Sequence, residues 1–218
     1  MDLSNARVLV TGGSRGIGHA TAALLRERGA QVAICGRDEA VLASAAEELG
    51  CRGIVCDVSQ EAQSQLMVEE AVSDLGGLDV LINNAAIGTF GTLLDSDGAD
   101  FERTLRVNVL GAYYVTRSAA RHFISQGGGH ILNVASTAAR KGFAGGGAYA
   151  ASKFALSALT ECWRAELRGH DIRVMQINPS EVQTGFGGRA APDHNPTKLQ
   201  AADVAQAMVD MLEMPDRG

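Results

Sequence analysis

Tyr149 and Lys153 place a phenol and an ammonium four positions apart in the segment YAASK. The residues that follow have the apolar pattern of a helix, and positions four apart on a helix share a face, with about 5–6 Å between Cβ atoms. A phenol at such a site could give up or accept a proton beside a cation that tunes its acidity. The alternative is an ordinary solvated helical turn, because a tyrosine and a lysine at this spacing form a short and common pattern.

A second chemical signal is the glycine-rich segment TGGSRGIG, from Thr11 to Gly18. It follows a short apolar run and opens a helical pattern, which is the context of a dinucleotide-binding turn. Gly12 would permit the tight turn, Gly16 would let the backbone approach a phosphate, and Gly18 would let the helix pack on the strand. The N–H groups at the start of the helix would then face a pyrophosphate. The alternative is a plain turn.

The end of the next apolar run bears on the ribose of such a dinucleotide. Gln31–Cys35 is followed by Gly36-Arg37, without the acidic residue that usually accepts hydrogen bonds from a 2′-hydroxyl. Arg37 and Arg15 are cations suited to a 2′-phosphate, so the sequence favours NADP over NAD. The alternative for Arg37 is a solvated surface arginine. Asp38 is predicted to cap the following helix.

Alternating strands and helices must position these groups. Short runs rich in valine and isoleucine alternate with longer helical patterns, which predicts parallel strands covered on both faces. The predicted strands are Arg7–Val10, Gln31–Cys35, Gly53–Cys56, Val80–Ile82, His130–Ala135 and Ile172–Ile177. The predicted helices are Ile17–Arg28, Glu39–Leu49, Glu61–Leu75, Asn108–Ser125, Tyr149–Leu167 and Asp203–Leu212. We therefore expect an α/β, Rossmann-type doubly wound parallel sheet in three layers, formed by a single domain over 1–218, with 185–200 as a substrate lid.

The composition argues against several classes of protein. The 218 residues carry a formal net charge of −6, which disfavours binding to nucleic acid or to anionic lipid. No apolar run approaches the ~20 residues of a membrane span. The cysteines and histidines lack metal-ligand spacing, so no metal site is expected. No basic segment precedes the first apolar run, and we expect a cytoplasmic protein with reduced thiols.

Taken in order, the motifs resemble those of the short-chain dehydrogenase/reductase family, and they extend over nearly the whole chain. They are TGGSRGIG, Asp57-Val58, NNAA at Asn83–Ala86, Asn108, Ser136, YAASK at Tyr149–Lys153, and Asn178-Pro179. Each is weak alone, whereas their order and spacing are specific. Two departures are Ala86, where the family usually has glycine, and Ser180, where a glycine usually follows the proline.

The resemblance implies a catalytic set of Asn108, Ser136, Tyr149 and Lys153. Tyr149 would donate a proton to a carbonyl oxygen during reduction, while Lys153 would lower the pKa of the phenol and hydrogen-bond the nicotinamide ribose. Ser136 would steady the carbonyl oxygen, and Asn108 would fix a water that relays protons to Lys153. Turn or capping roles are the alternative for Ser136 and Asn108 taken singly.

The resemblance also implies a set of cofactor contacts. Asp57 and Val58 would meet the adenine, Asn83 would line the cofactor cleft, and Ile17 and Thr184 would lie on the nicotinamide side. The alternative for Asp57 is a residue of a strand-end turn. The full predicted set is Gly12, Ser14, Arg15, Gly16, Ile17, Gly18, Arg37, Asp57, Val58, Asn84, Tyr149, Lys153, Pro179 and Thr184.

The function that follows is an NADP(H)-dependent oxidoreductase that interconverts a ketone and a secondary alcohol, with a small carbonyl or alcohol as its substrate. Its shape resembles that of 3-oxoacyl reductases and related carbonyl reductases. The alternatives are an NAD-dependent alcohol or sugar dehydrogenase, and a non-catalytic protein that senses a dinucleotide.

The substrate pocket and the subunit contacts are the least defined predictions. The loop Arg140–Ala148 and the segment after Thr184 would flank the pocket. Phe143 and Phe186 could contact an apolar part of the substrate or belong to the core; Lys141 and Arg189 could meet an anionic group or lie in solvent. Tyr149–Leu167 is apolar almost all round. The family often pairs subunits through this helix and Asn108–Ser125, so we expect a homodimer or homotetramer, with a monomer as the alternative.

Overall fold

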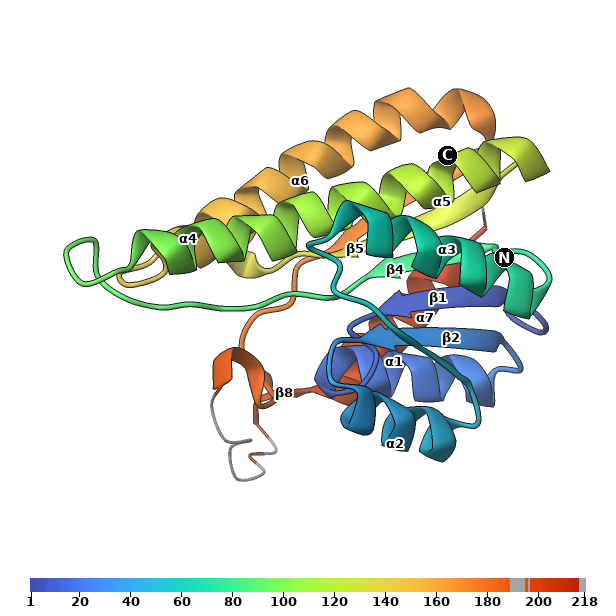
Figure 1. Ribbon diagram of the computed structural model, residues 1–218, viewed down its shortest axis with the longest axis horizontal. Helices are drawn as coiled ribbons and strands as arrows, with labels where there is room; N and C mark the ends of the chain where they lie inside the picture. Colours follow the sequence, from blue (N-terminus) through green and yellow to red (C-terminus); the bar gives the residue numbers. More distant parts are fainter. Residues whose placement is uncertain (189–194, 196, 216–218) are drawn as a thin grey trace.

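The computed structural model describes residues 1–188, 195 and 197–215 and is built around a parallel six-stranded sheet (Figure 1). The strands lie in the order β3-β2-β1-β4-β5-β6. Their bounds are β1 (Arg7–Thr11), β2 (Gln31–Gly36), β3 (Arg52–Val55), β4 (Val80–Asn83), β5 (Gly129–Val134) and β6 (Ile172–Ile177). The order reverses between β1 and β4, so the connections leave a crevice outside the carboxyl ends of these two strands.

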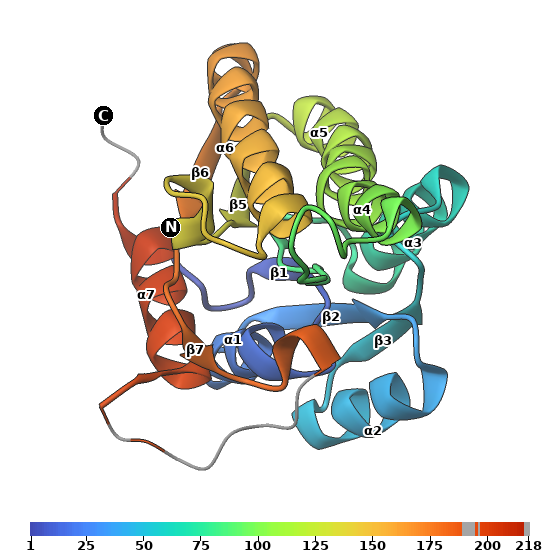
Figure 2. The same cartoon turned by 90° about the vertical axis from the view of Figure 1, so that its left-hand side faces the viewer.

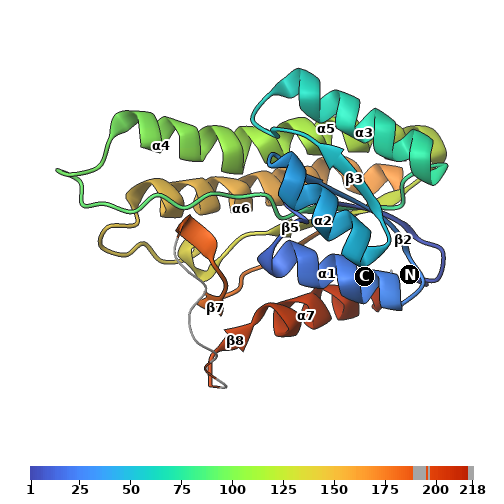
Figure 3. The same ribbon diagram turned by 60° about the horizontal axis from the view of Figure 1, so that its bottom comes forward.

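Two layers of helices cover the sheet, as Figures 1 and 3 show. One layer holds α1 (Gly16–Glu27), α2 (Glu39–Leu49) and α7 (Ala201–Glu213); the other holds α3 (Glu61–Leu75), α5 (Ala112–Gln126) and α6 (Gly147–Leu167). Side chains of β1 alternate between them: Val8 and Val10 join the core under α1 and α7, and Leu9 joins the core under α3, α5 and α6. The three-layer, doubly wound prediction is confirmed.

The predicted helix Asn108–Ser125 starts earlier than its apolar pattern indicates. It is preceded by α4 (Gly98–Leu105) and by a π-helical segment, Arg106–Gly111. In α4 only Thr104 is buried, and its 8 residues are too few for a periodic pattern to identify a helix from the sequence. Asp97 caps it by accepting a hydrogen bond from the Ala99 N–H at 2.9 Å.

Two short strands, β7 (Val182–Gln183) and β8 (Leu199–Gln200), pair in parallel outside the main sheet. Two residues are too few for a periodic signal, which is why the sequence did not predict them. β7 precedes the predicted lid, 185–200, and β8 forms its last two residues; residues 189–194 and 196 lie outside the described residues. Its described part includes a 3₁₀ turn at Phe186–Gly188. Within the described ranges, no helix combines the length and hydropathy needed to cross a bilayer.

Candidate active site

The glycine-rich turn between β1 and α1 needs its glycines for two physical reasons. Gly12 and Gly16 have φ angles of 65° and 58°, in the left-handed region that favours glycine. Gly18 is required for space, because a Cβ atom there would lie 2.3 Å from the Gly12 carbonyl oxygen and 2.5 Å from Asn84 Nδ2. The helix therefore approaches the turn more closely than any other residue would allow.

Asn84 holds this turn in place. Its Nδ2 donates hydrogen bonds to the carbonyl oxygens of Thr11 and Gly12, both at 3.0 Å, and its backbone N–H donates to Thr11 Oγ1. Asn83 points the other way, because successive side chains of a strand face opposite sides. It is buried, where its Nδ2 donates to Thr116 and Asn133. The expectation that Asn83 lines the cofactor cleft is therefore wrong.

The start of α1 has the features of a phosphate site. The helix begins at Gly16, and no side chain caps its first N–H groups. Those groups and the helix dipole favour an anion in front of them. Thr184 lies beside the turn, since a Cβ on Gly16 would be 3.4 Å from Thr184 Cγ2. Ser14 lies on its other side, with its Oγ 3.1 Å from where a Cβ on Gly36 would stand. These residues fit the pyrophosphate of a dinucleotide.

The ribose end of the predicted site carries two cations and one carboxylate. Arg37 is exposed immediately after β2, and Arg15 is exposed in the glycine turn. Asp38 accepts a hydrogen bond from the Val41 N–H at 3.1 Å, which confirms that it caps α2. The Arg15 guanidinium is 3.9 Å from the same carboxylate. Both partners are largely exposed, so this ion pair contributes little stability and leaves Arg15 available.

Asp57 and Val58, expected at the adenine, have structural contacts here. An oxygen of the Asp57 carboxylate accepts a hydrogen bond from the Ser59 N–H at 3.0 Å and so closes a turn after β3. Val58 is buried against Gly111, where a Cβ would lie 2.9 Å from Val58 Cγ2. Ile17 likewise packs against the core under α1. Contact of these residues with a cofactor stays a prediction.

Lys153 is a buried cation in the second turn of α6. It is 3% exposed, and its Nζ donates a hydrogen bond to the Val134 carbonyl oxygen at 2.9 Å. The nitrogen lies 5.7 Å from the centroid of the Tyr149 ring, so the helical spacing does bring the pair together. Burial lowers the pKa of Lys153 to about 8, because taking an ammonium out of water disfavours its charged form.

The Tyr149 phenol behaves differently from the prediction. Burial raises its pKa above the ordinary value, and a hydrogen bond with the Ser136 side chain acts in the opposite direction without overcoming that effect. Desolvation outweighs any help from Lys153, which lies over the ring and is itself a weakened cation. The expected lowering of the phenol's pKa by Lys153 is therefore not observed, and the hydrogen bond with Ser136 is a contact that the sequence did not predict.

Ser136 stands where β5 gives way to a 3₁₀ turn, Thr137–Ala139. Its Oγ accepts a hydrogen bond from the Ala138 N–H at 3.1 Å, so the capping role considered for this serine is real as well. The Thr137 N–H donates to the Pro179 carbonyl oxygen at 2.9 Å. Pro179 thus ties the end of β6 to the turn that carries Ser136.

Asn108 lies buried in the π-helical segment, and its side chain is fully engaged. Its Oδ1 accepts from the Ile87 N–H at 2.8 Å, and its Nδ2 donates to the Ile87 carbonyl oxygen and to Ser152 Oγ. Ser152 in turn donates to the Tyr149 carbonyl oxygen at 2.7 Å. Asn108 thus links the loop after β4 to the first turn of α6, and its role in a water relay to Lys153 stays a prediction. Ser152 stands within the YAASK motif but was not singled out from the sequence, because its burial is visible only in the structure.

Three phenylalanines form an aromatic cluster with the Tyr149 ring. The ring centroids of Phe90 and Phe186 lie 5.7 and 5.5 Å from that of Tyr149, and Phe143 lies 6.3 Å from Phe90. Phe90 was not singled out from the sequence, although an aromatic residue in a glycine-rich loop is a recognisable signal. Lys141 is exposed, and Arg189 lies outside the described residues.

These groups meet at one edge of the sheet. The glycine turn follows β1, Ser136 follows β5, and α6 brings Tyr149 and Lys153 beside them, all at the carboxyl ends of the strands that Figure 2 faces. This is where an open α/β sheet binds ligands. In the described part of the chain, no group of three histidine, cysteine, aspartate or glutamate side chains is arranged to hold a metal ion. The site can hold a dinucleotide and move a proton beside it.

Comparison with known proteins agrees with this chemistry. A family model described as short chain dehydrogenase matches residues 6–195. The chain is 42% identical over 186 residues to the sex determination protein tasselseed-2 of Zea mays, covering 81% of this chain and 55% of that protein. It is 35% identical over 214 residues to carbonyl reductase family member 4 of Xenopus tropicalis, covering 94% and 90% of the two chains.

A solved structure shows the same fold with a cofactor. The 3-ketoacyl-(acyl-carrier-protein) reductase of Brucella melitensis, complexed with NADH, superposes with a TM-score of 0.89 at 32% identity, over 96% of this chain and 91% of that one. The chain therefore belongs to the short-chain dehydrogenase family of NAD(P)-dependent oxidoreductases.

Proposed function

We propose that this protein is an NADP(H)-dependent reductase that interconverts a ketone and a secondary alcohol. The observation that carries the proposal is the convergence of Ser136, Tyr149 and Lys153 beside the glycine turn. When bound, the nicotinamide supplies the hydride for reduction and accepts it for oxidation. The protein supplies the position of the substrate and the proton.

The protonation of the site suits reduction. Because burial raises the pKa of Tyr149, its phenol carries a proton at neutral pH and can deliver it to a carbonyl oxygen as the hydride reaches the carbonyl carbon. The products are the secondary alcohol, oxidised nicotinamide and a Tyr149 phenolate, which regains its proton from solvent. Ser136, which is hydrogen-bonded to the same phenol, would steady the carbonyl oxygen. Lys153 would stabilise the transient phenolate.

Two similarities support a carbonyl substrate. The Xenopus relative is named a carbonyl reductase, and the Brucella structure is named a 3-ketoacyl reductase. The direct test is NADPH consumption with a panel of ketones. Tyr149→Phe should abolish turnover and leave cofactor affinity nearly intact, because the ring remains and only the hydroxyl is lost. Substantial residual turnover would contradict the acid role. NADPH binding without turnover of any ketone by the wild type would favour a dinucleotide sensor.

The preference for NADP rests on Arg15 and Arg37. Both are exposed at the ribose edge, and Asp38, the carboxylate nearby, is engaged in capping α2. An NAD-dependent alcohol or sugar dehydrogenase is the rival, and the NADH in the Brucella structure favours it. Arg37→Asp should shift the ratio of kcat/KM values from NADPH toward NADH by about tenfold or more, as expected for one lost charge-assisted bond to phosphate plus repulsion.

A matched control is Arg168→Asp. Arg168 is exposed at the opposite edge of the sheet, in the 3₁₀ turn Arg168–His170 just before β6. This change alters the net charge equally and should leave the cofactor ratio unchanged. If Arg37→Asp and Arg168→Asp had the same ratio of kcat/KM values for NADPH and NADH, Arg37 would not be part of the cofactor site.

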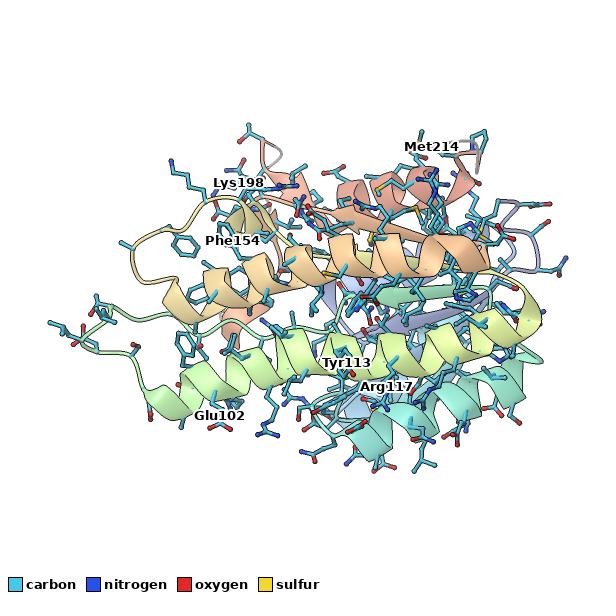
Figure 4. All side chains as sticks on the ribbon, turned by 90° about the horizontal axis from the view of Figure 1, so that it is seen from above. Glu102, Tyr113, Arg117, Phe154, Lys198 and Met214 are labelled. Atoms are coloured by element: carbon cyan, nitrogen blue, oxygen red, sulfur yellow. The ribbon has the colours of Figure 1, made fainter. Side chains whose placement is uncertain are left out.

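We also propose that subunits associate through the outer faces of α5 and α6, as a homodimer or homotetramer. Large apolar side chains are exposed on these helices, including Ile124 on α5. Tyr113 on α5 and Phe154 on α6, also exposed, are labelled in Figure 4. An apolar face of this kind is typical of a protein interface.

A further inference from the structure

Phe90 and Phe186 pack against the Tyr149 ring, and Phe143 packs against Phe90; we call these three phenylalanines the aromatic cage. The three rings come from separate segments: the loop between β4 and α4, the loop before α6, and the 3₁₀ turn after β7. Centroid separations of 5.5 to 6.3 Å and interplanar angles of 37° to 58° lie in the range of tilted aromatic packing. The cage and the Tyr149 ring therefore form one connected aromatic cluster.

Two glycines leave room for these rings. A Cβ on Gly88 would lie 2.6 Å from Phe186 Cε1 and 2.9 Å from Phe90 Cε2, so a bare backbone at this position makes room for both rings. A Cβ on Gly146 would lie 2.4 Å from Phe143 Cζ. The sequence thus combines large rings with adjacent glycines, and the positions of the rings depend on that combination.

The cage is not ordinary core packing. Phe90, Phe143 and Phe186 are 41%, 50% and 38% exposed, whereas Phe123, in the core, is fully buried. Each phenylalanine therefore keeps apolar surface exposed, and Phe90 and Phe186 do so while in contact with the Tyr149 ring.

We propose that the aromatic cage makes the enzyme selective for ketones that carry an aromatic ring or another flat apolar group next to the carbonyl. The proposal rests on the carbonyl reduction proposed above and assigns its substrate class. An aromatic substrate would gain ring contacts in addition to burial. A charged substituent placed against the same rings would lose hydration there.

Steady-state kinetics with NADPH on three ketones test this assignment. The substrates are an aryl methyl ketone, an aliphatic methyl ketone with the same number of heavy atoms, and the anionic 3-oxo acid acetoacetate. The wild type should have its highest kcat/KM on the aryl ketone. Phe90→Ala should raise KM for the aryl ketone about two- to tenfold, the range expected for one lost ring contact, with a smaller change in kcat and little change for acetoacetate.

Two controls separate the cage from general damage. Leu94→Ala alters the same loop at a side chain that is 93% exposed, and it should leave all three KM values unchanged. Gly88→Ala should repeat the effect of Phe90→Ala by displacing two rings. Gly169→Ala adds the same methyl group in the 3₁₀ turn before β6, where nothing lies within 4 Å, and it should have no effect. Thermal melts establish that each variant is folded.

The outcomes distinguish the two proposals. The proposed selectivity would be overturned if the wild type reduced acetoacetate as well as the aryl ketone. It would also be overturned if Phe90→Ala changed kcat/KM equally for all three ketones. A wild type that reduces none of them would overturn carbonyl reduction. In that case calorimetry with 1-phenylethanol, comparing the wild type with Phe90→Ala, still tests the cage, and equal affinities would reject it.

Discussion

At the scale of single residues, the site depends on a cation that the fold holds out of water. Lys153 keeps one recorded hydrogen bond, to the Val134 carbonyl oxygen, and burial lowers its pKa to about 8. The free amine in water has a pKa near 10.4. The native state therefore bears an electrostatic cost at neutral pH, which is typical of a residue retained for function rather than for stability.

This cost predicts how stability changes with pH. Below about pH 8 both the native and the unfolded chain hold the Lys153 proton, and the native state bears the full cost. Between pH 8 and 10.5 only the unfolded chain holds it, so the free energy of unfolding rises with pH. Relative to Lys153→Met, the wild type should gain about 2–3 kcal/mol between pH 7 and pH 10, measured by urea unfolding at both pH values.

Lys141→Met is the matched control for this prediction. Lys141 is exposed, and its removal should leave the pH dependence of stability parallel to that of the wild type. Parallel curves for Lys153→Met and the wild type would show that the ammonium is not desolvated in the native state.

At the scale of elements, the backbone geometry at the junction of β1 and α1 creates the candidate phosphate-binding site. The helix starts without a side-chain cap, and its first turn is held against the strand by Gly18 and by the amide of Asn84. Capping by Asp or Ser would stabilise the helix by about 1 kcal/mol. A cap would also occupy the N–H groups that a phosphate needs, so an uncapped start favours binding over stability.

Gly18→Ala should separate the helix from the turn. Its methyl group would collide with the Gly12 carbonyl oxygen, which is backbone and cannot move aside without shifting the turn. We expect a loss of about 1–3 kcal/mol in the free energy of unfolding and at least a tenfold weaker affinity for NADPH. Urea unfolding and NADPH fluorescence titration measure the two effects.

Gly98→Ala provides the comparison for Gly18→Ala. Gly98 is the first residue of α4, and nothing lies within 4 Å of a Cβ placed there. This variant should be as stable as the wild type or slightly more stable, because alanine favours the helix. If Gly18→Ala matched Gly98→Ala in stability and in affinity, the close approach of α1 to the turn would not be required.

At the scale of the whole molecule, the two helical layers differ in the side chains that their outer faces expose. The inner faces of α5 and α6 cover the sheet, and their outer faces carry exposed apolar and aromatic side chains (Figure 4). Phe154 is 46% exposed near the start of α6, one position after Lys153. Association through this face would also brace the helix that carries the candidate catalytic residues.

Phe154→Asp should therefore reduce the mass of the assembly in solution. A buried, unpaired carboxylate disfavours an apolar interface, and we expect light scattering at micromolar concentration to show a smaller species than the wild type. Leu66→Asp, at an exposed apolar position on α3, is the control and should leave the mass unchanged. A monomeric wild type would contradict the proposed association.

The sequence by itself determined the class of fold, the order of its main elements and the family. The bounds predicted for α2, α3 and β6 match those observed, because their apolar patterns and their flanking turn residues are strong local signals. The glycine turn was predicted for the same reason: its glycines meet a steric need that is local in the chain. Helix α4 and the strands β7 and β8 were missed, because they bury too little, or are too short, to leave a pattern.

Tertiary structure decided the environment of each functional group. The direction of the Tyr149 pKa, the burial of Lys153 and the inward orientation of Asn83 depend on which distant segments surround them. The same holds for the aromatic cage, whose rings all lie more than 40 positions from one another in the chain and meet only when three loops converge. Desolvation and ring packing are sums over neighbours in space, and the order of residues along the chain does not contain those neighbours.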